Sequence, residues 1–129
     1  MRAVDTNVLV RLITADDEEQ AARARRIMSS NGIFIATTVL LETEWVLRRG
    51  YRHAPAEIVA ALRALAGAEG VHVEDPVRLA TALDWTLQGL EFADALHLAG
   101  GSGCTDFVSF DQQLARRAAA LGALPVTEP

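Results

Sequence analysis

The N-terminal stretch RAVDTNVLV (residues 2–10) decides the fold, because it joins a short apolar segment directly to a helix. Its first residues predict a buried parallel strand that ends at Asp5. Thr6 or Asn7 then provides the cap of a short helix, since a side-chain oxygen at that position accepts a hydrogen bond from a free backbone amide. A strand followed at once by a helix is the repeating unit of α/β proteins.

The rest of the chain repeats this order of strand and helix. Further short strands are predicted at residues 33–36, 71–73, 107–110 and 124–126, and helices at residues 16–29, 39–49, 54–67, 75–88, 92–99 and 114–121. The helices at 39–49 and 54–67 are expected to form a hairpin. Strands that alternate with helices indicate an α/β fold in which helices cover both faces of a mostly parallel sheet.

Length and composition favour one globular domain that spans residues 1–129. Of these residues 50% are apolar and 22% are charged, which excludes the disordered and collagen-like classes. No segment approaches the ~20 apolar residues of a membrane span, and charged residues interrupt the N-terminus before any signal-like run, so a cytoplasmic protein is expected. The single cysteine, Cys104, fits a reducing compartment and is expected to be a small buried side chain.

The charge balance is acidic, and every basic residue is an arginine. The 17 acidic and 12 basic residues give a net charge of -5, so the field of the whole molecule should repel nucleic acid. A polyanionic substrate would therefore depend on local positive charge. Two clusters supply such charge: Arg23, Arg25 and Arg26, and then Arg48, Arg49 and Arg52. Each cluster is either a phosphate-binding group or the solvated face of a helix.

Four acidic residues have apolar neighbours where a surface carboxylate usually has polar ones: Asp5, Glu42, Asp94 and Asp111. Asp5 and Asp111 each follow a predicted strand, and the carboxyl ends of parallel strands meet at one crevice of an open α/β sheet. Glu42 and Asp94 lie on predicted helices that could point into the same crevice. Glu44 lies about 200° from Glu42 around the helix, so only one of them faces a common pocket, and Glu42 is the preferred candidate.

A pocket that gathers several carboxylates needs a positive partner, because like charges and burial both disfavour ionisation. Taken singly, each of these acids is more often a helix cap or a member of an ion pair. As a set they form the oxygen-only ligand group that Mg²⁺ and Mn²⁺ prefer. A divalent cation in such a group suits phosphodiester hydrolysis, because it activates water and stabilises charge on the phosphate.

Four sequence blocks carry a family resemblance: DTNVLVR (5–11), LETEWVL (41–47), FADALHLA (92–99) and VSFD (108–111). Together they closely resemble the PIN-domain family and, more narrowly, the VapC-type toxins of bacterial and archaeal toxin-antitoxin pairs. The blocks follow the family's order and spacing from Val4 to about Leu121. The resemblance implies a three-layer fold with a five-stranded sheet of order 3-2-1-4-5. It also implies a metal-dependent endoribonuclease that uses Mg²⁺ or Mn²⁺, and a homodimer inhibited by a small cognate antitoxin.

The resemblance also implies a role for individual residues. Asp5 and Asp94 match the family's principal metal ligands, Glu42 matches its helical acid and Asp111 its fourth acid. The small polar positions around this group are matched by Thr6, Asn7 and Ser109. The family often has threonine where Ser109 stands, and serine keeps the hydroxyl group.

Other functions remain open at this point. The chain is alternatively a housekeeping PIN nuclease without an antitoxin, or a catalytically silent binding module whose acidic pocket receives a basic side chain of a partner. His97, one turn after Asp94, either assists the substrate or metal or packs as a structural histidine.

The predicted hairpin raises the question of a dimer. Trp45 and the apolar stripe of Ile58, Leu62 and Leu65 either pair across a dimer axis or pack within the chain. In a dimer, Arg48, Arg49 and Arg52 would lie beside paired active sites as RNA contacts.

Overall fold

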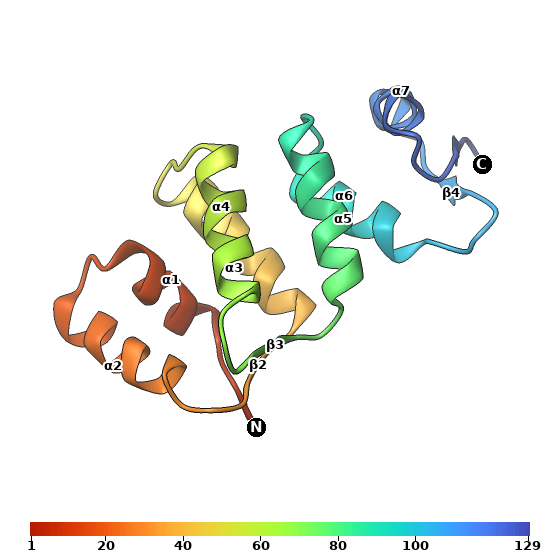
Figure 1. The fold of residues 1–129 in the computed structure, drawn as a ribbon. Coiled ribbons are helices and arrows are strands. Elements are labelled where there is room, and N and C mark those ends of the chain that lie inside the picture. The colour runs from red at the N-terminus through yellow and green to blue at the C-terminus, as the bar shows by residue number, and fades with distance from the viewer. The chain divides into compact units, whose positions relative to one another are not determined.

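The computed structural model describes residues 1–129, which divide into two compact units, Met1–Pro76 and Val77–Pro129. In Figure 1 the first unit runs from red to green and the second from green to blue. The first unit contains β1 (Arg2–Ala3), α1 (Thr6–Thr14), α2 (Glu18–Met28), β2 (Ile33–Ile35), α3 (Thr37–Arg49), α4 (Pro55–Ala66) and β3 (Val71–Val73). The second contains α5 (Pro76–Leu87), α6 (Phe92–Gly100), β4 (Phe107–Val108), α7 (Gln112–Leu121) and β5 (Val126–Thr127).

The first unit is built on a parallel sheet with β2 in the centre. β2 pairs with β1 through Arg2 opposite Ile33, and with β3 through Ile33 opposite Val71. Ile33 and Ile35 of β2 are fully buried, as expected for a strand flanked on both sides. Because the three strands are parallel, β1 and β2 end at the same edge, and α1 and α3 both begin there.

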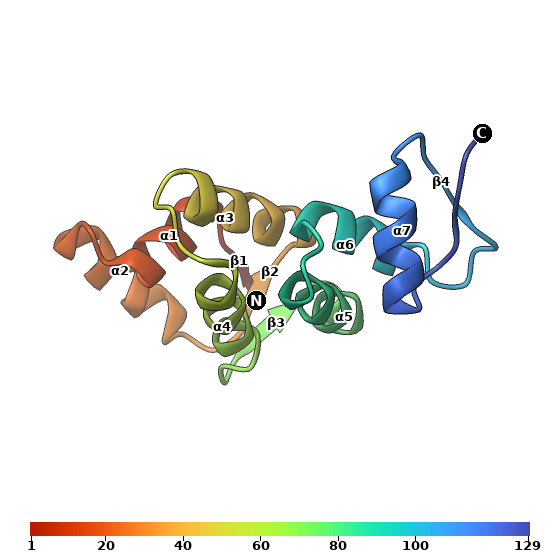
Figure 2. The ribbon, with the colours of Figure 1, turned by 90° about the horizontal axis from the view of Figure 1, so that it is seen from above.

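Two helix pairs complete the first unit (Figures 1 and 2). α1 lies beside α2, and α3 contacts both α1 and α4. α2 begins where the Asp17 carboxylate accepts a hydrogen bond from the backbone amide of Gln20, and α4 begins with Pro55 in its first turn. The apolar stripe of α4, including the fully buried Leu62, packs inside this unit. The predicted hairpin is therefore present, and its stripe is used within the chain rather than across a dimer axis.

The second unit combines the helices α5, α6 and α7 with the short sheet of β4 and β5. Apolar side chains of α5 and α6, among them Leu83 and Phe92, are buried, and the Arg78 guanidinium of α5 donates to the carbonyl oxygen of Leu96 on α6 over 2.8 Å. β4 pairs in parallel with β5. α7 packs against β5 and ends at Gly122, whose φ of 66° lies in the left-handed region that favours glycine.

The structure corrects one part of the predicted fold. Seven helices and only parallel strand pairs are present, but the strands form two sheets, of orders β1-β2-β3 and β4-β5, in place of one five-stranded sheet of order 3-2-1-4-5. The joining pair would be β1 and β4, which are each only two residues long and offer few backbone hydrogen bonds. β4 is shorter than the predicted strand at 107–110, and Phe110 is exposed. No helix is both long and apolar enough to cross a membrane.

Candidate functional site

Asp5 lies at the carboxyl end of β1, directly before α1. Its backbone has the extended conformation of a helix cap, with φ of -88° and ψ of 162°, yet its side chain makes no capping hydrogen bond. The residue is exposed. An aspartate at this position usually accepts a hydrogen bond from a free backbone amide in the first turn of the helix. Here both carboxylate oxygens stay available for another partner.

Glu42 lies on α3 and is joined to the start of α1 by a side-chain hydrogen bond. The Thr6 hydroxyl donates to Oε1 of Glu42 over 2.5 Å. Thr6 is buried, with 4% of its surface exposed, whereas Glu42 is exposed. A buried threonine therefore holds one oxygen of an accessible carboxylate. This contact follows from the parallel pairing of β1 and β2, which starts both helices at the same edge.

Glu44, two residues further along α3, has a different environment. It is 4% exposed, and the guanidinium of Arg48 donates to its carboxylate over 2.8 Å. Glu42 and Glu44 therefore have different surroundings, as their separation around the helix predicts, and Glu42 stays the preferred candidate. Arg48 is half-buried in this ion pair, whereas Arg49 and Arg52 are exposed and form no ion pair.

Asp94 and Asp111 belong to the second unit. Asp94 lies in the first turn of α6 and is only partly exposed. Burial, followed by the negative charges of Glu91 and Asp111, raises the pKa of Asp94, while the charges of His97 and Arg117 act in the opposite direction. The negative charge of Asp111 is thus one of the smaller influences on Asp94 within this unit.

Asp111 is the N-cap of α7. Its Oδ1 accepts a hydrogen bond from the backbone amide of Leu114 over 3.0 Å, and its own amide donates to the hydroxyl of Ser109 over 3.1 Å. One oxygen of the carboxylate is therefore committed to the helix, and Oδ2 is the oxygen that remains for a ligand. Ser109, expected as a supporting polar residue, acts here on the backbone of Asp111.

The structure places the side chains of Cys104 and His97 on the surface. Cys104 is exposed rather than buried, because it lies in the turns between α6 and β4 and not in an apolar strand. His97 is also exposed, which excludes a packed side chain and leaves a hydrogen-bonded structural role or a role with the substrate or metal. Its position one turn after Asp94 leaves it free to interact with that carboxylate or with a ligand.

A network on the first unit was not predicted. The Tyr51 hydroxyl donates to Asp16 over 2.6 Å, and the Arg11 guanidinium donates to the other oxygen of Asp16 over 2.8 Å. The hydrogen bond from Tyr51 is the main cause that lowers the pKa of Asp16, with further contributions from Thr14 and Arg11. Tyr51 is 35 residues from Asp16 in the sequence, and no local pattern signals such a pair.

The residues present fit a hard divalent cation in their chemistry. All four acids offer carboxylate oxygens, and no cysteine or histidine cluster competes with them. Burial is the main cause that raises the pKa of Asp94, and a nearby cation would lower that pKa again. No group of three or more His, Cys, Asp or Glu side chains is gathered closely enough to hold a metal ion. Asp5 and Glu42 belong to the first unit, and Asp94 and Asp111 to the second.

We expect Arg48→Ala to destabilise the fold by about 1–3 kcal/mol, because it leaves the buried Glu44 carboxylate without its partner. Arg49→Ala, one residue further along α3, removes an exposed charge and should change the free energy of unfolding by less than about 0.5 kcal/mol. Urea unfolding of the two variants measures the difference. Equal effects would show that the Glu44–Arg48 pair does not contribute to the fold.

The raised pKa of Asp94 predicts that the stability of the fold depends on pH. At a pH above the pKa of Asp94 in the folded state, the ionised carboxylate destabilises the fold. This destabilisation disappears when the pH falls below 3.8, the ordinary pKa of an aspartate. In EDTA at pH 7 we expect Asp94→Asn to unfold at a higher temperature than the wild-type protein, with the difference shrinking towards pH 3.5. Mg²⁺ should then stabilise the wild-type protein and not the variant. A wild-type protein that is the more stable of the two in EDTA at pH 7 would contradict the assigned cause.

Comparison with known proteins identifies the family to which the chain belongs. No curated protein matches the sequence. Among solved structures, the crystal structure of Mycobacterium tuberculosis VapC20, described as a sarcin-ricin loop cleaving toxin, is similar at 25% sequence identity over 95% of each chain, with a TM-score of 0.44. The family model of the PIN domain matches residues 2–120, which is nearly the whole chain. This match confirms the family predicted from the four sequence blocks: the chain belongs to the PIN domain family.

Proposed function

We propose that this protein is a metal-dependent endoribonuclease and the toxin of a VapBC-type toxin-antitoxin pair. Membership of the PIN domain family supports the nuclease chemistry. The observation that carries the proposal is the arrangement at the start of α1. There Asp5 keeps both oxygens free, and the buried hydroxyl of Thr6 holds the exposed carboxylate of Glu42. A carboxylate that is oriented by a hydrogen bond from a neighbouring side chain, as Glu42 is, is typical of metal ligands.

In this proposal Asp5, Glu42, Asp94 and Asp111 together hold Mg²⁺ or Mn²⁺. When bound, the cation activates water and stabilises negative charge on the phosphate. Thr6 fixes one oxygen of Glu42, which leaves Oε2 for the ligand. The first turn of α7 fixes Oδ1 of Asp111, which leaves Oδ2. The chain's own hydrogen bonds thus orient two of the four carboxylates before any ligand arrives, which lowers the entropic cost of binding.

The remaining assignments concern RNA and protein partners. Arg49 and Arg52 are exposed cations and are proposed as RNA contacts, whereas the bond to Glu44 gives Arg48 a mainly structural role. The VapC-like sequence blocks support a small antitoxin as the protein partner and a cytoplasmic place of action. Trp45 on α3 is 56% exposed, which favours a homodimer that covers it.

The proposal predicts that the purified chain cleaves a total RNA pool into discrete fragments in the presence of Mg²⁺ or Mn²⁺ and not in EDTA. Glu42→Gln should abolish cleavage, because it removes a charged ligand. Thr6→Val should lower activity by about 10–100-fold, because it only releases the orientation of that ligand. Gel or end-mapping analysis of the fragments measures both effects and identifies the cleaved sequence.

Two matched controls separate site effects from general ones. Glu69→Gln changes an exposed glutamate in the turn before β3, and Thr105→Val changes an exposed threonine before β4. Both variants should cleave as the wild-type protein does. Absence of cleavage by folded, antitoxin-free wild-type protein would overturn the nuclease and favour the silent binding module. Cleavage that Glu42→Gln does not reduce would overturn the assigned site.

A further inference from the structure

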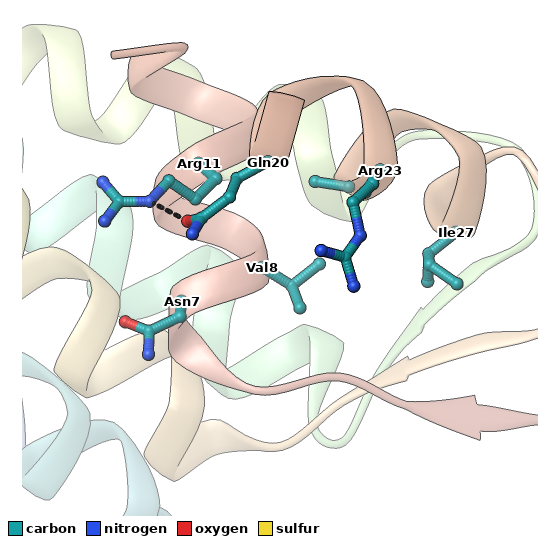
Figure 3. Close-up of a pocket in the computed structure, with 7 residues that line it drawn as sticks. Asn7, Val8, Arg11, Gln20, Arg23 and Ile27 are labelled. Atoms are coloured by element: carbon teal, nitrogen blue, oxygen red, sulfur yellow. Dashed lines mark hydrogen bonds between the residues drawn. The ribbon is translucent and has the colours of Figure 1, made fainter. Parts of the chain in front are cut away.

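A cavity of about 370 Å³ lies between α1 and α2 in the first unit (Figure 3). Its volume falls in the range of roughly 300–1,000 Å³ that is usual for small-ligand pockets. From α1 it is lined by Asn7, Val8 and Arg11, and from α2 by Gln20, Arg23 and Ile27. None of these residues belongs to the four acids of the proposed metal site.

The two arginines of the cavity differ in how their charge is used. Arg11 donates to Asp16, Tyr51 and Gln20, so its guanidinium is held and largely neutralised. Arg23 has only a long pairing of 3.9 Å with Glu19, and both side chains are mostly exposed. An exposed ion pair of this length contributes little to stability, so Arg23 can readily leave Glu19 and bind another anion. Arg23 is therefore the available cation of the cavity.

The other lining groups add hydrogen bonding and apolar contact. The Oε1 atom of Gln20 accepts from Arg11 over 2.6 Å, which fixes the amide and leaves its Nε2 as a donor. The side-chain amide of Asn7 makes no hydrogen bond within the protein and is exposed. In the view of Figure 3 the guanidinium of Arg23 lies between the aliphatic side chains of Val8 and Ile27, and that of Arg11 points away from Val8.

This combination matches a nucleotide better than a bare anion. One guanidinium suits a phosphate, two amides suit the edge of a base or a sugar hydroxyl, and the aliphatic side chains suit the face of a base. The acidic run at residues 16–19 at the end of the same helix pair would weaken the binding of an isolated phosphate. A ligand that adds apolar contact and amide hydrogen bonds is better suited to this environment.

One residue of the cavity is close in sequence to the proposed metal site. Asn7 is two residues from Asp5, so their Cα atoms are at most about 7.6 Å apart. We infer that the α1–α2 cavity is a subsite that binds one nucleotide of the RNA beside the phosphate that is cleaved, with Arg23 on its phosphate. The identity of the larger ligand as RNA rests on the proposed function. The binding of a nucleotide does not, and it can be measured without catalysis.

The test is a titration of the full-length protein in EDTA with adenosine and uridine 5′-monophosphate, followed by amide NMR. The expected result is saturable shifts centred on Asn7, Val8, Gln20 and Ile27. Arg23→Ala should weaken binding about tenfold, since a charged hydrogen bond of about 1.5 kcal/mol is lost. Arg25→Ala is the matched control: it removes the same charge two residues along α2, outside the cavity, and should change the affinity less than twofold.

Each outcome decides the inference. Shifts elsewhere in the chain, no saturable shifts, or equal effects of Arg23→Ala and Arg25→Ala would overturn it. Inorganic phosphate that binds as tightly as the nucleotides would reduce the cavity to an anion site and would also overturn it. In RNA cleavage, Arg23→Ala should raise KM and leave kcat unchanged. Cleavage of RNA without nucleotide binding would support the proposed nuclease and refute the subsite. Nucleotide binding without cleavage would support the subsite and refute the nuclease.

Discussion

The parallel pairing of β1 with β2 is the constraint on which the candidate site depends. Parallel strands end at one edge of their sheet, so the helices that follow them begin at that edge. Asp5 and Thr6 are therefore brought to α3, and the hydroxyl of Thr6 reaches Glu42 across 36 positions of sequence. The fully buried Ile33 and Ile35 of β2 fix the register of this pairing. If that register slipped by one residue, the start of α1 would shift along α3 and the contact would be lost.

Much of the fold and part of the site could be predicted from the sequence, because their signals are local. The helices have clear apolar stripes and end signals, and β3 was predicted at the residues where it lies. Helix geometry alone predicted that Glu42 and Glu44 do not face the same pocket, and the structure gives them different surroundings, one exposed and one buried. The family was identified from four short blocks, because chemically constrained residues recur at fixed spacing.

The features that were missed depend on contacts that are distant in sequence or on very short strands. Two-residue strands such as β4 carry too few side chains for an alternating pattern, so their ends and their joining into one sheet were not predictable. The bond of Tyr51 to Asp16 and the burial of Glu44 with Arg48 are set by how helices pack. Cys104 was expected to be buried because a predicted apolar strand follows it, but it lies in an exposed turn between α6 and β4.

The central proposal is that Asp5, Glu42, Asp94 and Asp111 hold one divalent metal centre. A crystal structure of the protein soaked with Mn²⁺, analysed by anomalous scattering, tests this claim most directly. We expect an anomalous peak with Asp5 and Asp94 oxygens at bonding distance, and with Glu42 and Asp111 bound directly or through water. A peak at other residues, or no peak at millimolar Mn²⁺ in a crystal where these carboxylates are accessible, would contradict it.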